Sequence, residues 1–421
     1  MTAAGIGETM KRMETLAIVG AGLAGTECAS AYVGAGGTAD VVLIDSRPEP
    51  TELPPLSKTL FAEQLNLVPL QLAGSVRLVE GTVAEVAADG RSLRLADGQR
   101  LECDSLVVAT GLQARRPHTE LPGGPVHTIR TSADAEAIRA AVTPGADIGV
   151  LGSGYLALEA ARGAADAGHS ATVYLRGDRP LIGRHHESIG RALMERHAEA
   201  GVQFVLEADP SDYAAHDLWI AAVGGSPLTE WLPESWDRSG SGHLSVTGGM
   251  QVTSSRQPVS GVWAIGDLAQ LSTGPFAGAG PMESEAAASS QGAWLGEQLA
   301  AGAPAESEWI DVPWHWSFQG SERVFAAGRV TDTEAALVSG DTSSGRFQVL
   351  HFHEDVLCGA ETLNQPPAHN AARKLLARPA ADRPTLSDVA DVTGITEAAE
   401  TPPGAAATAF DLRAWERRLR N

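Results

Sequence analysis

The sequence predicts an α/β protein in which one strand–turn–helix–strand unit occurs twice and an α+β domain follows. Two apolar runs end in glycine-rich turns near residues 20 and 152, and each turn is followed by a helix-like segment and a second apolar run. Past Pro313 the pattern changes to aromatic, strand-like stretches and one helix with a basic end. A length of 421 residues also favours two or three domains, because single cores rarely grow that large.

The first unit begins with the apolar run Leu16–Val19. It continues through Gly22–Ala35, a segment of small and apolar residues without proline that predicts a helix. The run Asp40–Asp45 follows, and its continuous apolar character predicts a strand that is buried on both faces. Strand, glycine turn, helix and strand make a βαβ unit. A proline-rich loop comes next.

A β-meander is expected after this loop, between residues 76 and 103. Asp-Gly pairs at residues 89–90 and 97–98 are hairpin signals between short apolar stretches. The expected strands are Arg77–Val79, Ala84–Val86, Leu93–Leu95 and Leu101–Cys103. The run Ser105–Gly111 then predicts another buried strand, which ends in a glycine.

The same order of elements then restarts. Asp147–Leu151 predicts a strand, Leu156–Ala167 a helix and Ser170–Leu175 a second strand, so the unit is duplicated within the chain. A further buried strand is expected at Gly261–Asp267.

The carboxyl-terminal part is expected to be an α+β domain. Arg346–Phe352 predicts a strand and Pro367–Arg378 a helix. Glu397–Thr408 is rich in alanine, proline and threonine, which predicts a mobile segment. For Phe410–Arg420 two structures remain open, a short basic amphipathic helix and a frayed, solvated tail.

The composition excludes several classes of protein. A net charge of −21 argues against nucleic acid as a general partner, because phosphate binding needs a basic surface. Cys28, Cys103 and Cys358 form no C-x-x-C pair, so neither a disulfide framework nor a thiolate metal site is indicated. His185 and His186 are adjacent, but too few further ligands are visible to predict a metal site. No run approaches the ~20 apolar residues that span a bilayer, and we expect a cytoplasmic protein without a membrane partner.

The first glycine turn has the spacing Gly20-x-Gly22-x-x-Gly25 and lies between a predicted strand and a predicted helix. The first glycine permits the tight turn, the second lets a pyrophosphate approach the backbone, and the third lets the helix pack closely on the strand. The amino end of the helix then faces the phosphates. Asp45, at the end of the second strand, is placed to accept hydrogen bonds from an adenosine ribose. The glycines alone are a weak signal, but in this context they indicate a dinucleotide site.

The second turn repeats this spacing at Gly152, Gly154 and Ala157, since alanine is allowed at the third position. The strand that follows leads into Arg176 and Arg179, where an acidic ribose ligand would otherwise stand. Guanidinium groups pair well with phosphate oxygens, so these arginines favour NADPH over NADH. The alternative is that both are solvated surface side chains.

Several segments resemble the pyridine nucleotide-disulfide oxidoreductase superfamily, and within it the FAD-dependent ferredoxin reductases. The resemblance covers roughly residues 16 to 390 and rests on Val19–Gly25, Leu53–Lys58, Ala109–Gly111, Ile129–Thr131, Gly152–Glu159, Ala264–Asp267, Met282–Ser284, Pro313–Ser317 and Asn364–Pro366. It implies two Rossmann-like dinucleotide-binding domains, for FAD and NAD(P), plus a C-terminal α+β domain. The expected boundaries are 1–115 with 245–309 for FAD, 116–244 for NAD(P), 310–396 for the third domain and 397–421 for a mobile tail.

The resemblance also implies roles for individual residues. Asp267 would hold the ribityl chain of FAD, and the backbone of Val83 would hold the adenine. Lys58 would lie near the flavin N5 edge, paired with Glu159, where its ammonium would stabilise negative charge on the ring. These two are the expected catalytic residues; the alternative is that they are unrelated surface residues. The expected cofactor-binding residues are Gly20, Gly22, Leu23, Ala24, Gly25, Asp45, Ser46, Arg47, Lys58, Val83, Thr110, Gly111, Arg130, Gly266, Asp267, Ser284 and Glu285, with Gly152, Gly154, Tyr155, Leu156, Glu159, Arg176 and Arg179 at the second turn.

The absence of a cysteine pair separates this chain from the disulfide reductases, which place a Cys-x4-Cys pair beside the flavin. The corresponding stretch Pro48–Leu60 contains no cysteine, and no pair lies near the second turn. Electrons must therefore leave the flavin by another route. The resemblance implies that they leave one at a time, toward a small iron–sulfur ferredoxin that serves a P450 or a Rieske oxygenase.

Departures from the family pattern lie on the expected electron-exit side. The stretch Ser272–Pro281 is uncharged where the family carries basic and aromatic residues, which would weaken electrostatic steering of an acidic ferredoxin. Phe318 replaces an aspartate, Gly320 a tyrosine, and Glu285 an apolar residue beside the flavin. The side chain of Glu285 could instead point to solvent, since a buried unpaired carboxylate is costly. Replacement positive charge could come from Arg323, Arg329, Arg373, Lys374 or the Arg413–Arg420 tail.

Three functions follow from these observations. The leading one is an NAD(P)H-dependent ferredoxin reductase. An NAD(P)H oxidase or small-molecule reductase on the same scaffold is favoured by the uncharged loop and Glu285. A non-catalytic FAD-binding scaffold is the third, and Lys58 and Glu159 argue against it. A homodimer is left open.

Overall fold

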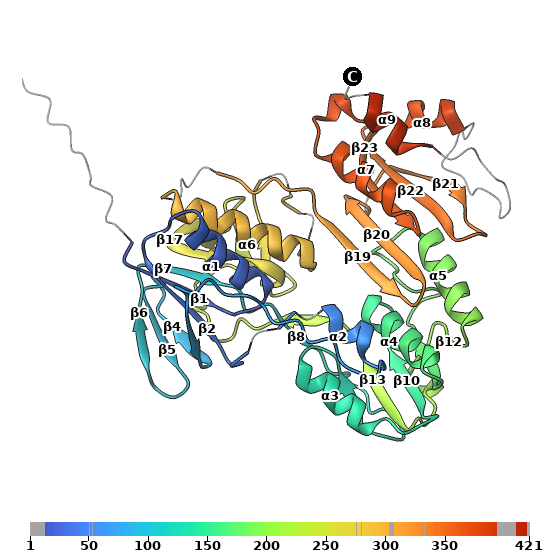
Figure 1. The fold of residues 1–421 in the computed structure, drawn as a ribbon, viewed down its shortest axis with the longest axis horizontal. Helices are drawn as coiled ribbons and strands as arrows, with labels where there is room; N and C mark the ends of the chain where they lie inside the picture. Colours follow the sequence, from blue (N-terminus) through green and yellow to red (C-terminus); the bar gives the residue numbers. More distant parts are fainter. Residues whose placement is uncertain are drawn as a thin grey trace, which may run out of the picture.

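The computed structural model describes residues 13–49, 51–52, 54–274, 276–278, 280–302, 307–331, 333–393 and 410–418. Three larger sheets, each with its own helices, organise this part of the chain (Figure 1). The predicted α/β class with a carboxyl-terminal α+β domain is confirmed. Leu53 of the resemblance, the whole of the expected mobile segment Glu397–Thr408 and residues 419–421 lie outside the described residues.

The first sheet has eight strands in the order β18-β15-β16-β17-β7-β1-β2-β3. Strands β17, β7, β1, β2 and β3 pair in parallel, as the predicted βαβ unit requires. The bounds are β1 Thr15–Val19, β2 Asp40–Asp45, β3 Arg77–Glu80, β7 Ser105–Val108, β15 Leu244–Val246, β16 Gln251–Ser254, β17 Gln257–Ala264 and β18 Ala269–Leu271.

Two helices, α1 (Leu23–Gly34) and α6 (Glu285–Ala300), lie side by side on this sheet (Figure 1). Glycines allow their close approach. A Cβ atom at Gly292 would lie 2.3 Å from the carbonyl oxygen of Ala24, and one at Gly296 would lie 2.4 Å from that of Cys28. Residues 257–300 are thereby packed against the amino-terminal unit, although more than 200 positions separate them in sequence.

The meander contains three strands, β4 (Val83–Val86), β5 (Ser92–Leu95) and β6 (Arg100–Glu102). Both hairpins are confirmed, and their turns carry Gly90 and Gly98 with positive φ angles of 71° and 91°. The expectation that Arg77–Val79 would be a fourth meander strand is wrong. That segment is β3, which pairs in parallel with β2 at the edge of the first sheet. Its apolar residues fit either sheet equally well, and only the tertiary fold selects the partner.

The second sheet has five parallel strands in the order β12-β11-β10-β13-β9, so the internal duplication is confirmed. Its strands are β9 Val126–Thr128, β10 Asp147–Leu151, β11 Ser170–Tyr174, β12 Gln203–Val205 and β13 Leu218–Ala221. Its helices are α3 Ser132–Ala141, α4 Tyr155–Asp166 and α5 Glu187–Glu199. A two-stranded ribbon of β8 (Leu112–Ala114) and β14 (Gly225–Pro227) carries the chain between the first two sheets. Short helical segments α2 (Pro54–Thr59), η1 (Pro210–Asp212) and η2 (Gly266–Leu268) complete these two parts.

The third sheet is antiparallel, in the order β19-β20-β23-β22-β21. Its strands are β19 Trp314–Gln319, β20 Glu322–Gly328, β21 Ala335–Asp341, β22 Arg346–His353 and β23 Val356–Leu363. Its helical elements are α7 Pro366–Leu376, η3 Ala380–Asp382, α8 Leu386–Thr393 and α9 Leu412–Arg418. Leu158, Leu181 and Leu193 of the second part share one hydrophobic cluster with Phe347 and Leu363 of the third, which fixes the two parts together.

The expectation of a mobile tail is wrong for residues 410–418. Phe410 and Leu412 are buried in the core of the third part, and α9 packs on α7. The side-chain amide of Gln348 donates to the carbonyl oxygen of Phe410 at 2.6 Å, and the Ser339 hydroxyl accepts from the Phe410 amide at 2.7 Å. The amphipathic-helix alternative therefore describes this segment.

Candidate active site

A cavity of about 1680 Å³ lies where the three parts meet. Most of the predicted site residues line it, namely Gly20, Gly22, Leu23, Ala24, Asp45, Ser46, Arg47, Lys58, Val83, Thr110, Gly111, Arg130, Tyr155, Leu156, Glu159, Gly266, Asp267, Ser284 and Glu285. Gly25, Gly152, Gly154, Arg176 and Arg179 do not line it. The cavity therefore brings together the first glycine turn, the amino-terminal end of α4 and the start of β19.

The first glycine turn has the geometry that a pyrophosphate requires. Gly20 has a φ angle of 106°, and a Cβ atom there would lie 2.3 Å from the carbonyl oxygen of Ala109. At Gly25 a Cβ atom would lie 2.0 Å from the carbonyl oxygen of Gly20, so only glycine allows α1 to pack this closely. Gly22, the N-cap residue of α1, has no side chain to cap the helix, and a Cβ atom there would meet nothing within 4 Å. The free N–H groups at the helix start can therefore receive an anion.

Asp45 ends β2 beside this turn and is ionised. Its carboxylate accepts from the amide of Ala21 at 2.7 Å and from the guanidinium of Arg47 at 2.9 and 3.0 Å. Burial alone would raise the pKa of Asp45, but the hydrogen bonds and charge of Arg47 outweigh it and hold the pKa below its usual value. The residue predicted to bind the adenosine ribose, Asp45, is thus an ionised carboxylate paired with Arg47.

Farther along the cavity, polar groups without protein partners fit a bound cofactor. The Thr110 hydroxyl is buried and has no hydrogen-bond partner among the residues described. A buried polar atom of this kind is costly unless a ligand satisfies it. Arg130 and Asp267 face each other at 3.5 Å, a separation long enough to leave both groups able to bind a ligand. These residues fit the ribityl and ring end of FAD.

Lys58 and Glu159 form an ion pair in the cavity wall, as the resemblance implies. The Lys58 ammonium lies 3.2 Å from one carboxylate oxygen of Glu159 and 3.3 Å from the other. Glu159 is 4% exposed. The ammonium also lies 4.5 Å from the ring centroid of Trp316, a cation–π contact. The interpretation of Lys58 and Glu159 as unrelated surface residues is therefore wrong.

Two serines complete the shell around Glu159, and sequence reasoning assigned no role to either. The hydroxyl of Ser57 donates to one carboxylate oxygen, and that of Ser317 donates to the other at 2.6 Å. Gln319 in turn donates to Ser317 at 3.0 Å. Both serines lie inside segments that carried the resemblance, and that position is the signal that could have found them. Residues from α2, α4 and β19 thus hold one carboxylate.

Glu285, the first residue of α6, lines the cavity with its side chain half-buried. Burial and the nearby Glu52 raise the pKa of Glu285, while the Lys58 charge lowers it. The preceding Ser284 caps α6 by accepting from the amide of Ala287 at 3.1 Å and donates to the carbonyl oxygen of Trp314 at 3.0 Å. The pKa of Glu285 is on balance raised, and its carboxyl group is part of the cavity wall.

The second turn repeats the geometry of the first. Gly152 has a φ angle of 146°, and a Cβ atom there would lie 2.3 Å from the carbonyl oxygen of Ala222. Gly154 faces open space at the start of α4, and Ala157 is fully buried. Tyr155 and Leu156 follow directly and line the cavity. A dinucleotide held at this turn can thus extend along α4 toward Lys58.

Arg176 and Arg179 follow β11 near the second turn. Arg176 is exposed and has no hydrogen bond or ion pair to another described residue. Arg179 pairs with Asp178 at 2.8 Å, and Asp178 also lies 3.4 Å from Arg191. Of these two arginines, only Arg176 therefore has a guanidinium group that no carboxylate of the described residues binds.

One glycine turn lies in the cavity wall and the other directly precedes Tyr155 and Leu156 of that wall, and this pair of turns defines the chain as an oxidoreductase that passes hydride between nucleotide cofactors. Sequence comparison makes the assignment narrower. The pyridine nucleotide-disulphide oxidoreductase model matches residues 14–292, and the chain belongs to this family. A second model, described as the reductase C-terminal domain, matches residues 314–393. The family uses FAD and NAD(P)H, and the expected cofactors are confirmed.

Individual relatives cover almost the whole chain. Rhodocoxin reductase of Rhodococcus erythropolis is 28% identical over 95% of this chain and 93% of the relative. Putidaredoxin reductase of Pseudomonas putida is 27% identical over 87% of this chain and 92% of the relative. Among solved structures, putidaredoxin reductase in its covalent complex with putidaredoxin superposes with a TM-score of 0.76 at 24% identity, covering 86% of this chain and 93% of that one. A ferredoxin reductase from Rhodopseudomonas palustris gives 0.78 at 23% identity, covering 89% and 98%. The solved structures show the shared fold.

The three cysteines of the chain are free thiols. Burial raises the pKa of Cys28 and of Cys103 to about 12, and that of Cys358 to about 11. Cys358 lines the cavity beside Arg329, but it has no thiol partner. Among the described helices, none combines the length and the apolar character that crossing a bilayer requires.

Proposed function

We propose that this oxidoreductase is a ferredoxin reductase: it takes hydride from NAD(P)H at the second turn, onto FAD at the first, and passes electrons to a small iron–sulfur protein that serves a P450 or a Rieske oxygenase. The observation that carries the proposal is the ion pair between Lys58 and the buried carboxylate of Glu159, which joins the two dinucleotide-binding parts inside one cavity that holds no cysteine pair. The printed names of the relatives support the acceptor class.

The residues described above would divide between the two cofactors. Gly20, Gly22 and the start of α1 would hold the FAD pyrophosphate, and Asp45 the adenosine ribose. Arg130, Asp267 and the unpartnered Thr110 hydroxyl would bind toward the flavin ring. FAD supplies the ability to accept two electrons together and release them singly.

Lys58 would act as the fixed positive charge at the reacting end of the cavity. Glu159 holds the ammonium by direct pairing, and Ser57 and Ser317 satisfy the remaining carboxylate lone pairs. A preorganised charge in a water-poor site stabilises developing negative charge more strongly than the same charge in water. Glu159 and its serines would therefore be positioning residues for Lys58.

NADPH is the proposed donor. Arg176 is exposed close to the second turn and faces no competing carboxylate among the described residues, so it can receive a 2′-phosphate. Arg179 contributes less, because Asp178 already occupies its guanidinium.

The proposed docking face for an acidic ferredoxin lies on the third-sheet side of the cavity. Arg329 and Arg383 line the cavity there, and Arg373 lies over Trp314 with its guanidinium carbon 4.1 Å from the ring centroid. Ile310 is 73% exposed at the same rim. The three arginines would supply the positive charge that the 272–281 loop lacks. Arg383→Glu should lower kcat/KM for ferredoxin and leave flavin reduction unchanged, whereas Arg346→Glu, remote from the cavity, should change neither.

We also propose the three-domain division given above, with 410–418 added to the third domain. A cytoplasmic location is supported by the three free thiols, which a reducing compartment preserves.

The test is anaerobic reduction by NADPH followed by addition of candidate ferredoxins, with cytochrome c as the final electron acceptor. Fast ferredoxin-dependent cytochrome c reduction with little peroxide in air supports the proposal. A second candidate, an NAD(P)H oxidase, is favoured by the carboxyl group of Glu285 in the cavity wall. Rapid oxygen consumption without any ferredoxin effect would select it instead.

A further inference from the structure

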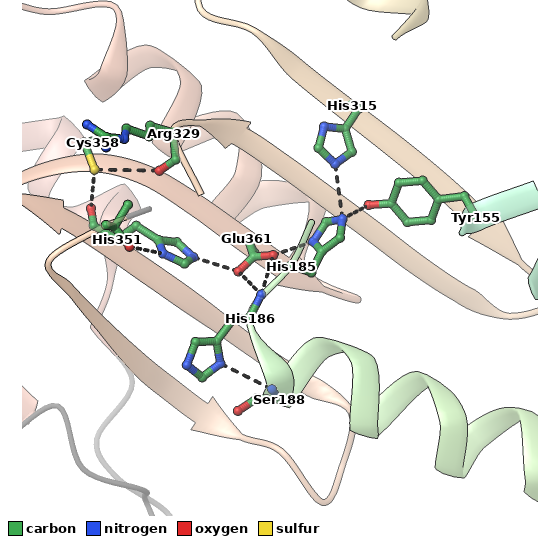
Figure 2. A network of polar contacts seen from close by, with 10 residues as sticks. Tyr155, His185, His186, Ser188, His315, Arg329, His351, Cys358 and Glu361 are labelled. Carbon is green, nitrogen blue, oxygen red and sulfur yellow. Dashed lines mark hydrogen bonds and ion pairs between the residues drawn. The ribbon is translucent and has the colours of Figure 1, made fainter. Parts of the chain in front are cut away.

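A buried chain of polar side chains runs from the cavity wall into the third part of the protein (Figure 2). The Tyr155 hydroxyl is hydrogen-bonded to Nε2 of His185, and Nδ1 of His185 is hydrogen-bonded to Glu361. The other carboxylate oxygen of Glu361 accepts from Nε2 of His351 at 2.7 Å and from the backbone amide of His186 at 3.1 Å. Glu361 therefore has a partner for each oxygen.

The chain joins two structural parts. Tyr155 begins α4, directly after the second glycine turn, and His185 lies in the loop before α5. Glu361 lies on β23 and His351 on β22 of the third sheet. The side chains of Glu361 and His185 are both fully buried. Of these four, Tyr155 and His185 line the cavity. The third part thus reaches the cavity through His185 and Tyr155.

The charge of Glu361 fixes the direction of the hydrogen bonds that reach its carboxylate. Burial raises the pKa of Glu361, but His185 and His351 outweigh this effect and lower it to about 2, so the carboxylate is ionised. Burial and the charges of Glu361 and Glu159 raise the pKa of Tyr155, so its hydroxyl stays protonated. Because an ionised carboxylate only accepts, Nδ1 of His185 donates to Glu361, and Nε2 of His185 contacts both the Tyr155 hydroxyl and Nε2 of His315, which is 3.3 Å away.

The Tyr155 ring is also held by its neighbours. Its centroid lies 5.3 Å from that of His185 and 5.6 Å from that of His315, and the two histidine rings are 5.2 Å apart. Burial and the nearby His185 lower the pKa of His315 to about 3, so His315 is neutral at neutral pH. With its hydroxyl engaged by His185, Tyr155 presents the ring and not a free donor to the cavity.

We propose that His185 and Glu361 are positioning residues for Tyr155, and that the Tyr155 ring, held in this way by the third domain, sets where the nicotinamide of the donor sits against the Lys58 end of the cavity. The inference rests on the proposed function. Tyr155 and Glu159 are four residues apart on α4, so their side chains lie on the same side of the helix. A nicotinamide entering from the second turn must pass the Tyr155 ring to reach the ammonium that Glu159 holds.

A metal site is not an alternative explanation of this cluster. Within the residues that the structure describes, no three histidine, cysteine or carboxylate side chains are arranged to hold a metal ion.

The same part of the protein contains a matched chain away from the cavity. The Tyr174 hydroxyl lies 2.9 Å from Nε2 of His216, and Nδ1 of His216 lies 2.8 Å from Asp147. None of these three residues lines the cavity. Tyr174→Phe therefore removes the same type of hydrogen bond as Tyr155→Phe, together with the one that the Tyr174 hydroxyl accepts from the Ala214 amide at 3.2 Å, but without contact to the cavity.

The test measures flavin reduction by NADPH in a stopped-flow instrument, over a range of NADPH concentrations, for the FAD-loaded protein. Tyr155→Phe should lower the limiting rate constant about fivefold, the effect of losing the orientation that one net hydrogen bond provides. The Kd for NADPH should change less than the rate constant. Glu361→Gln should lower the same rate constant, and Tyr155→Phe combined with Glu361→Gln should be no slower than Tyr155→Phe alone, because Glu361 acts only through Tyr155.

The control and the other outcomes are decisive. Tyr174→Phe should match wild type in both constants. If Tyr155→Phe keeps the wild-type rate constant, the positioning role is wrong. The role is also wrong if the rate constant falls equally in Tyr174→Phe. If Glu361→Gln does not fold, Tyr155→Phe alone decides. If NADPH fails to bleach the flavin of the wild-type protein, the proposed function itself fails, which is a different result from unchanged variant kinetics.

Discussion

Removal of the Lys58 ammonium is expected to change both stability and rate, by amounts that the structure allows us to work out. Two unit charges 3.2 Å apart attract each other by about 5 kcal/mol at an effective dielectric constant of about 20. Desolvation of the buried carboxylate opposes this attraction, so Lys58→Met should lower the free energy of unfolding by about 3 kcal/mol. The rate constant of flavin reduction should fall about 100-fold, as expected when a preorganised charge is lost.

A double variant separates the two effects. In Lys58→Met combined with Glu159→Gln, no uncompensated buried carboxylate remains, so most of the lost stability should return. The rate constant should stay low, because the ammonium itself is still missing. Urea unfolding measures the first quantity and stopped-flow absorbance near 450 nm the second.

The matched control is Arg94→Met, which breaks the exposed Arg94–Glu85 pair at 2.7 Å on the meander. It should cost at most about 1 kcal/mol and leave the rate unchanged. Recovery of the rate in the double variant would refute the electrostatic role of Lys58, since the pair would then act through structure alone. A wild-type rate in Lys58→Met would do the same.

Three further changes test other parts of the site. Gly25→Ala should abolish FAD retention, because the added Cβ atom would lie 2.0 Å from a backbone oxygen; Gly34→Ala in the same helix meets nothing within 4 Å, and its flavin absorbance should equal wild type. Arg176→Ala should raise the KM for NADPH about tenfold and leave the KM for NADH unchanged, with Arg191→Ala as the control; equal effects on both coenzymes would remove the 2′-phosphate assignment. Burial lowers the pKa of His197 from 6.5 to about 4. The unfolded state therefore binds the proton first, and stability present above pH 6.5 is lost toward pH 4 by about 1.4 kcal/mol per unit; His197→Gln should flatten the pH dependence of urea unfolding, and an unchanged slope would contradict this.

Local signals predicted the backbone geometry of the two glycine turns correctly because that geometry is determined locally. The conformations of Gly20 and Gly152, and the close contact at Gly25, follow from a few neighbouring residues of one βαβ unit. The Lys58–Glu159 pair joins residues 101 positions apart and was reached only through the family resemblance.

What the sequence could not predict depends on contacts between distant segments. The partner of β3 was missed because its apolar pattern suits a meander and a parallel sheet equally. The helix at Leu412–Arg418 follows a segment of low hydrophobicity, and its burial depends on a core built by β21 to β23. The partnership of His185 with Glu361 spans 176 positions, and two adjacent histidines alone carry no information about a carboxylate on another sheet.

The stoichiometry of reduction tests the central claim most directly. In an anaerobic titration of the FAD-loaded protein, one equivalent of NADPH per flavin should bleach the absorbance near 450 nm completely, because FAD would be the one two-electron acceptor and the three cysteines form no pair. An end point at two equivalents would reveal a second redox centre. A flavin that stays oxidised would show that the two dinucleotides do not meet in this cavity.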